Sequence, residues 1–212
     1  MPPLQVRVPR KAGRPAGSLK GERKDEIVAT ALNVFAESGY HSCSLAKVAE
    51  AVGVSQATVL HHVGSKDGLL VEVLHLRDRL DAELLDHVPE PFGWGAFEYM
   101  ITVLEANTRR PKLVGLYIKV AGEALTPDHP AASWLRSHFD QSVGLLMFSL
   151  AMGIGDGTVR PDIPMDRVAR TFVALLDGLQ LQWLENPEAV DMVACARDAL
   201  DAIKERWSLP AE

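Results

Sequence analysis

The feature that most constrains the fold is a pair of short helical segments separated by a glycine, within residues 44–63. Ser44 and Ser55 each precede apolar residues at helical spacing, where a serine side chain caps a helix by accepting a backbone N–H. Gly53 can adopt the positive φ of a tight turn, which other residues adopt only under strain. Ala49, with its small side chain, lets the two helices cross closely. We therefore predict a helix-turn-helix in which Val59 is buried.

Apolar residues at helical spacing continue along the rest of the chain. No segment alternates with a period of two between hairpin turns, so we predict an all-α fold of about nine helices. We expect the first helix over residues 25–38 and a long fourth helix from Ser65 to about His87. Later helices are expected near residues 95–109, 111–125, 130–153, 165–185 and 187–207.

The composition is that of a globular protein that folds without disulfides. The chain has 212 residues, of which 47% are hydrophobic, and its two cysteines are far apart in the sequence. This length is enough to bury a substantial core. The apolar segment over residues 141–155 is free of charged residues but too short to cross a bilayer, and the N-terminus lacks the apolar run of a secretory signal. We therefore expect a cytoplasmic protein.

The formal net charge of −6 conceals a basic N-terminal arm. Residues 1–24 carry seven Lys and Arg against one Glu, and the remainder is acidic. Proline and glycine interrupt this arm, so we expect residues 1–22 to be disordered when free. The run Gly13-Arg14-Pro15 resembles the core of an AT-hook, in which the arginine enters the narrow minor groove of A·T-rich DNA. A tail that only increases solubility remains the alternative.

The segment from Ile27 to Leu70 resembles the DNA-binding domain of the TetR (tetracycline repressor-like) family. The matching positions are Phe35, Gly39-Tyr40, Ser44, Val48-Ala49, Gly53-Val54-Ser55, Thr58, His62 and Ser65-Lys66-Asp67. The resemblance implies a three-helix DNA-binding domain over residues 23–70. It implies a helical effector-binding and dimerisation domain over residues 71–212.

The resemblance also implies which residues contact DNA. Gln56 and Ala57 would contact base edges, adenine through the amide and a thymine methyl through the alanine. Ser44, Thr58, His62 and Lys66 would contact phosphates. The chain departs from the family pattern at three positions: Leu60 replaces a usual aromatic residue, Val63 a frequent Phe, and Ala46 a frequent Arg. We expect His61 and the basic arm to supply part of the DNA contact that these changes remove. The full predicted set is Arg14, Ser44, Ala46, Ser55, Gln56, Ala57, Thr58, Leu60, His61, His62 and Lys66.

The last two long helices are expected to form a four-helix bundle between two subunits. The residues predicted at this dimer seam are Val168, Leu175, Gly178, Leu179, Gln182, Val193, Ala194, Arg197 and Leu200. The helices between the DNA-binding domain and these last two helices carry many aromatic and methionine side chains. Such side chains suit an apolar effector pocket with a few polar groups. The predicted pocket residues are Phe97, Met100, Leu104, Tyr117, Trp134, His138, Gln141, Phe172, Leu176 and Gln180. Each of these side chains also fits an ordinary core.

An enzyme is disfavoured because the chain has no HExxH, GxSxG or Walker-type motif. The glycines over residues 153–157 follow a helix and predict a helix-ending turn. His61 and His62 are adjacent on a helix and point too far apart to share a metal ion, so we expect no metal and no cofactor. The sequence therefore predicts a homodimeric repressor that leaves a palindromic operator when a small apolar effector binds. The alternative is an architectural DNA-binding protein without an effector.

Overall fold

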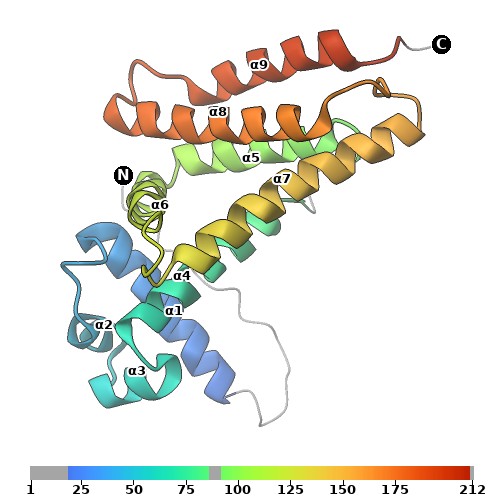
Figure 1. The fold of residues 1–212 in the computed structure, drawn as a ribbon. Coiled ribbons are helices and arrows are strands. Elements are labelled where there is room, and N and C mark those ends of the chain that lie inside the picture. Colours follow the sequence, from blue (N-terminus) through green and yellow to red (C-terminus); the bar gives the residue numbers. More distant parts are fainter. Residues whose placement is uncertain (1–18, 86–91, 211–212) are drawn as a thin grey trace. The chain divides into compact units, whose positions relative to one another are not determined.

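The computed structural model describes residues 19–85 and 92–210, and within these ranges it contains nine α-helices. Figure 1 follows them along the chain. The helices are α1 (Leu19–Ser38), α2 (Leu45–Val52), α3 (Gln56–Val63), α4 (Lys66–Ala82), α5 (Gly95–Thr108), α6 (Pro111–Glu123), α7 (Ala132–Gly155), α8 (Met165–Glu185) and α9 (Met192–Trp207). In the part of the chain described, β pairing is limited to one isolated bridge between Val159 and Ser208. The all-α prediction is confirmed.

Most helix boundaries agree with the sequence prediction within a few residues, and α8 (Met165–Glu185) matches its expected range although no side chain caps it. Ser44 and Ser55 begin α2 and α3 as expected. The first helix begins earlier than predicted, and the fourth ends at Ala82, before His87. The glycine-rich segment does end α7, at Gly155. The last helix begins later than predicted, because the Asp191 side chain accepts the Ala194 N–H and caps α9 there.

The chain divides into two compact units that interleave in the sequence. The first unit comprises residues 1–79 and 112–134, and the second comprises residues 80–111 and 135–212. Contacts within the first unit explain why α6 belongs to it, although it lies far from α1 in the sequence. Lys112 forms an ion pair with Glu37 at 3.4 Å, and the ring of His41 lies 3.0 Å from the Glu123 carboxylate. The sequence predicted two domains that are each continuous in sequence and meet after residue 70, whereas each compact unit consists of two separate stretches of the chain.

The first unit has a small apolar core formed by α1 and the helices that pack on it. Phe35 in α1 is 1% exposed and lies edge-on to Tyr40, with ring centroids 5.5 Å apart. Val48 in α2 and Val59 in α3 are completely buried. These contacts fix α2 and α3 against α1 and leave the opposite face of α3 exposed.

The second unit has a separate core in which α9 packs along α8 and α5 (Figure 1). The rings of Phe97 in α5 and Phe172 in α8 lie 5.0 Å apart, and both side chains are completely buried. Glu98 in α5 pairs with Lys204 in α9. No helix in the described ranges is both long enough and apolar enough to span a membrane.

Candidate nucleic-acid interface

The turn between α2 and α3 depends on the left-handed backbone of Gly53. Its φ is 79° and its ψ is 35°. The Gly53 N–H donates to the carbonyl of Ala49 at 2.9 Å, and the Val54 N–H donates to the same carbonyl at 2.9 Å. Ala49 is 3% exposed, which is consistent with the close helix crossing predicted from its small side chain. A glycine is required here because the positive φ strains residues that have a Cβ.

Two serines fix the N-termini of α2 and α3. Ser44 Oγ accepts the Lys47 N–H at 3.2 Å, and Ser55 Oγ accepts the Thr58 N–H at 3.1 Å. The Thr58 hydroxyl also lies 2.8 Å from Ser55 Oγ. Both serines remain exposed, so each supports its helix while its hydroxyl stays at the surface.

One face of α3 is exposed and carries four of the predicted contact residues. These are Gln56, Ala57, Leu60 and His61. Thr58 and His62 are half-buried beside this face, and the rings of His61 and His62 lie edge to face with centroids 5.5 Å apart. No lysine or arginine occurs in α3. The face therefore offers an amide, apolar groups and an imidazole to a ligand.

Lys66 begins α4, and two contacts to the segment between α1 and α2 hold its ammonium group. Its ammonium group donates to the carbonyl of His41 at 3.2 Å and lies 4.4 Å from the centroid of the Tyr40 ring. The Tyr40 hydroxyl donates to the Asp67 carboxylate, and burial, followed by this hydrogen bond, raises the pKa of Tyr40. The ammonium group has three N–H donors, so the carbonyl of His41 leaves capacity for an anion. Sequence reasoning missed this role of Tyr40 and His41, although Tyr40 belongs to the recognised motif.

Other predicted residues of this region occupy different environments. Ala46 is exposed on α2, and Arg14 lies outside the described residues. The thiol of Cys43 is buried, and burial raises its pKa despite the partly offsetting ammonium groups of Lys47 and Lys66. A raised pKa disfavours the thiolate, which is the reactive form of a cysteine side chain. The described part of the chain contains no group of three His, Cys, Asp or Glu residues that could hold a metal ion.

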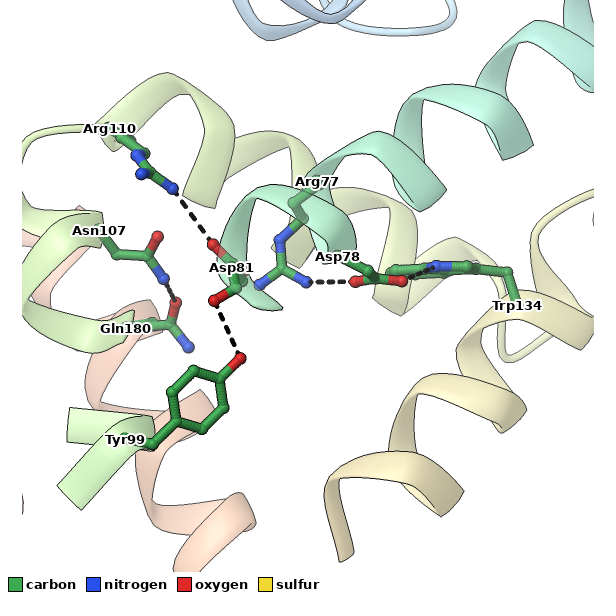
Figure 2. A network of polar contacts seen from close by, with 8 residues as sticks. All are labelled: Arg77, Asp78, Asp81, Tyr99, Asn107, Arg110, Trp134 and Gln180. Carbon is green, nitrogen blue, oxygen red and sulfur yellow. Dashed lines mark hydrogen bonds and ion pairs between the residues drawn. The ribbon is translucent and has the colours of Figure 1, made fainter. Parts of the chain in front are cut away.

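Two of the predicted effector residues belong to the first unit. Tyr117 and Trp134 are buried, with ring centroids 6.2 Å apart. Arg77 lies over the Tyr117 ring at 4.2 Å, and its guanidinium group pairs with Asp78 at 3.3 Å. The Trp134 indole donates to the same carboxylate at 2.7 Å (Figure 2). These residues form a buried polar and aromatic cluster at the C-terminal part of α4.

The other eight predicted effector residues belong to the second unit, where most of them lie on α5 and α8. Asn107 donates to the side-chain carbonyl of Gln180 at 2.9 Å, and Gln180 is 5% exposed (Figure 2). Nearby, Arg110 pairs with Asp81 at 3.2 Å. Gln141 is exposed and His138 is half-buried on α7. The five predicted residues that are buried in this unit are Phe97, Leu104, Phe172, Leu176 and Gln180.

A separate open cavity of about 780 Å³ is lined by Trp94, Thr158 and Ser208 among others. Sequence reasoning gave no signal for it, because segments far apart in the sequence form it. Residues 207–209 lie beside residues 158–160: the Arg160 N–H donates to the Trp207 carbonyl at 2.8 Å, and the Leu209 N–H donates to the Thr158 carbonyl at 3.1 Å.

The predicted dimer residues differ in exposure. Val168, Leu179 and Leu200 are buried in the second unit's own core. Leu175, Gly178 and Val193 are half-buried, and Gln182, Ala194 and Arg197 are exposed. Leu181 in α8 is 55% exposed but was not predicted at the seam. Six of the nine predicted residues are therefore at least partly exposed in the single chain, and Leu181 is a large apolar side chain exposed on the same helix as three of these six.

Comparison with known proteins gives matches to bacterial regulators. Residues 27–73 match the family model described as bacterial regulatory proteins of the tetR family. The transcriptional repressor AcnR of Corynebacterium jeikeium is 28% identical over 163 residues, which cover 74% of this chain and 79% of AcnR. Such relatives are named as repressors and regulators rather than enzymes.

Solved structures of regulators share the fold. A TetR regulator from Haloarcula marismortui is 18% identical, with a TM-score of 0.77 over 89% of this chain and 100% of its own. A transcriptional regulator from Saccharomonospora viridis, solved in complex with choline, is 22% identical, with a TM-score of 0.67 over 90% of this chain and 100% of its own. At these identities the likeness shows the fold alone.

Proposed function

Since the chain belongs, through residues 27–73, to the tetR family of DNA-binding transcriptional regulators, we propose that two copies of it form a repressor that a small apolar effector releases from DNA. The observation that carries the proposal is the exposed face of α3, held outward by Gly53, Ser55 and the buried Val59. An exposed helix of this kind enters a major groove in helix-turn-helix proteins.

Within this proposal the DNA contacts divide into two kinds. Gln56 reads a base edge, because its exposed amide can both donate to and accept from adenine. Ala57 contacts a thymine methyl group. Ser44, Thr58, His62 and Lys66 position the domain on the phosphates, which carry no sequence information directly. The Lys66 ammonium group is favourably located for this role, because it lies at the N-terminus of α4.

The dimer forms through α8 and α9. The exposed side chains available for it are Leu181, Gln182, Ala194 and Arg197, together with the half-buried Gly178. The side chain of Leu181 gains most from burial, since it is large, apolar and 55% exposed in the single chain. A two-fold symmetric dimer implies an operator with two-fold symmetric half-sites.

The effector enters between α5 and α8 in the second unit. An apolar ligand there must separate the rings of Phe97 and Phe172, which lie 5.0 Å apart, so its binding changes the packing of the two helices. The Asn107–Gln180 hydrogen bond supplies polar groups that orient a ligand. A regulator of this fold solved with choline supports a small-molecule effector.

The α4 helix carries the response, because it begins next to α3 and continues past Arg79 into the second unit. Release of DNA requires that the effector bind more tightly to the state that does not bind DNA. A coupling free energy of roughly 1–3 kcal/mol would be typical for such a response.

Selection of DNA from a random duplex library tests the function. The full-length protein would be mixed with the library at about 150 mM salt, and the retained duplexes sequenced. We expect a two-fold symmetric motif, which would then serve to screen small molecules for release. Recovery of unrelated duplexes, or of A·T-rich tracts alone, would contradict sequence-specific regulation and favour an architectural protein.

Two substitutions test the assigned contacts on the selected motif. Gln56→Ala should weaken binding by about 1–3 kcal/mol to duplexes that contain the base pair contacted by Gln56. Duplexes in which that base pair is changed should bind the variant and the wild type equally. Lys66→Ala should weaken binding to all duplexes and reduce the salt dependence by about one phosphate contact. Lys119→Ala is the matched control for Lys66, since Lys119 is exposed on α6 in the same unit. Wild-type affinity in the folded Gln56 and Lys66 variants would contradict the proposed interface.

A further inference from the structure

Leu60 is an exposed large apolar side chain on the face of α3 that we assign to DNA. It is 38% exposed, whereas the neighbouring Val59 is completely buried. Ala57 lies one helical turn earlier and is also exposed. Residues three apart on a helix are neighbours on its surface, so Ala57 and Leu60 form one continuous apolar strip.

The other groups on this face limit which bases it can read. Arginine and lysine make the commonest specific contacts with guanine, and α3 contains neither. Gln56 has the amide that pairs with adenine. The remaining group that distinguishes one base from another and suits an apolar side chain is the 5-methyl group of thymine, which lies in the major groove.

We propose that Leu60 is a specificity-determining residue that contacts the 5-methyl group of a thymine in each half-site. This inference rests on the proposed function. Burial of one methyl group against Leu60 makes that position prefer thymine over unmethylated pyrimidines, by about fourfold in affinity. Ala57 makes the equivalent contact at a neighbouring position, so the sequence read by α3 is predicted to be rich in A·T pairs.

Deoxyuridine substitution isolates this contact, because it removes the 5-methyl group and keeps every hydrogen-bonding group of thymine. Starting from the symmetric duplex selected by the full-length protein, each thymine pair related by the two-fold axis would be replaced by deoxyuridine in turn. We expect wild-type affinity to fall about fourfold per half-site at one position for Leu60 and at another for Ala57. Other positions should change little.

The Leu60→Ala variant assigns the position. It should bind the original duplex more weakly and lose the preference for thymine over deoxyuridine at one position only. Leu125→Ala is the matched control, because Leu125 is 77% exposed in the same unit and takes no part in the proposed interface. This control should keep the wild-type preference at every position. Where the assigned pair is changed to C·G, 5-methylcytosine should restore part of the affinity in the wild type and none in Leu60→Ala.

The outcomes separate this inference from the proposed function. If the protein selects no sequence, the proposed function fails and this inference fails with it. If a symmetric motif is selected but no position responds to deoxyuridine, the inference alone is overturned. The inference is also overturned if Leu60→Ala keeps the wild-type preference for thymine at every position.

Discussion

The α2–α3 segment and the second unit are stabilised by contacts that differ greatly in sequence separation. In the α2–α3 segment, Ser55 bonds the backbone of Thr58, and Gly53 bonds the carbonyl of Ala49. In the second unit, Asn107 bonds Gln180, 73 residues away. Glu98 bonds Lys204, which lies 106 residues further along the chain.

This difference explains why one region can be identified from the sequence more easily than the other. A cap or a left-handed glycine is encoded in a few adjacent residues, and each contributes about 1 kcal/mol or somewhat more. A buried aromatic contact between distant helices contributes more, yet neither residue reveals its partner. We therefore expect substitutions in the second unit's core to have the larger effects on stability.

The largest effect is expected from Phe172→Ala. Phe172 is completely buried against Phe97, so its truncation should lower the free energy of unfolding by about 3–5 kcal/mol. Urea denaturation would measure this loss. Phe148→Ala is the matched control, because Phe148 is 56% exposed and contacts Phe92 at a centroid distance of 6.0 Å; it should cost less than about 1 kcal/mol. Equal losses would contradict the described core.

Gly153→Ala is expected to have the next largest effect. A Cβ at this position in α7 would lie 2.6 Å from Val159 Cγ2 and 2.8 Å from Gly93 Cα, and the second of these is a backbone atom. Relieving this overlap should cost about 1–3 kcal/mol of the free energy of unfolding. Gly144→Ala, at an open position of the same helix, should instead stabilise the protein by up to about 1 kcal/mol. Equal changes in the free energy of unfolding for Gly153→Ala and Gly144→Ala would contradict the close approach of Gly153 to Gly93 and Val159.

Gly53→Ala tests the local geometry of the α2–α3 turn. No atom lies within 4 Å of the added Cβ, so only the left-handed backbone opposes the change. The cost should be about 1–2 kcal/mol in thermal or urea unfolding. Gly115→Ala is the control in the same unit, because Gly115 lies in α6 with open space around it and no positive φ. A neutral Gly53→Ala variant would mean that the turn does not need a left-handed residue.

The smallest effect on stability is expected from Ser55→Ala, at about 1 kcal/mol. The substitution removes the side-chain acceptor of the Thr58 N–H and so frays the first turn of α3. Ser55→Asn keeps an acceptor at this position and should restore most of the stability. Parallel measurements of unfolding and DNA affinity would separate the cap from a direct contact. Equal destabilisation by both substitutions would exclude the capping role.

Much of the first unit could be predicted because short sequence patterns determine its local geometry. The burial of Val59, the caps at Ser44 and Ser55 and the turn at Gly53 all followed from residue type and spacing. The association of α6 with this unit did not, since the pairs Lys112–Glu37 and His41–Glu123 join residues that no local pattern relates.

The dimer and effector predictions depended on information that the sequence lacks. Helical spacing predicted which residues of α8 and α9 share a face, but it could not distinguish side chains buried within the chain from side chains left for a partner. Val168, Leu179 and Leu200 are buried within the second unit, whereas Leu181 is exposed. Tyr117 and Trp134 similarly belong to a different unit from Phe97 and Phe172.

The sequence by itself determined that the chain is helical and where its helix-turn-helix lies, because caps, a glycine turn and helical spacing act over a few residues. Only the tertiary structure decided which apolar side chains are buried within the chain and which stay exposed, Leu60 and Leu181 among them. The physical reason is that burial of apolar surface is non-directional. Any apolar face gains free energy against any other, so the partner of each face is fixed by how all the helices pack together.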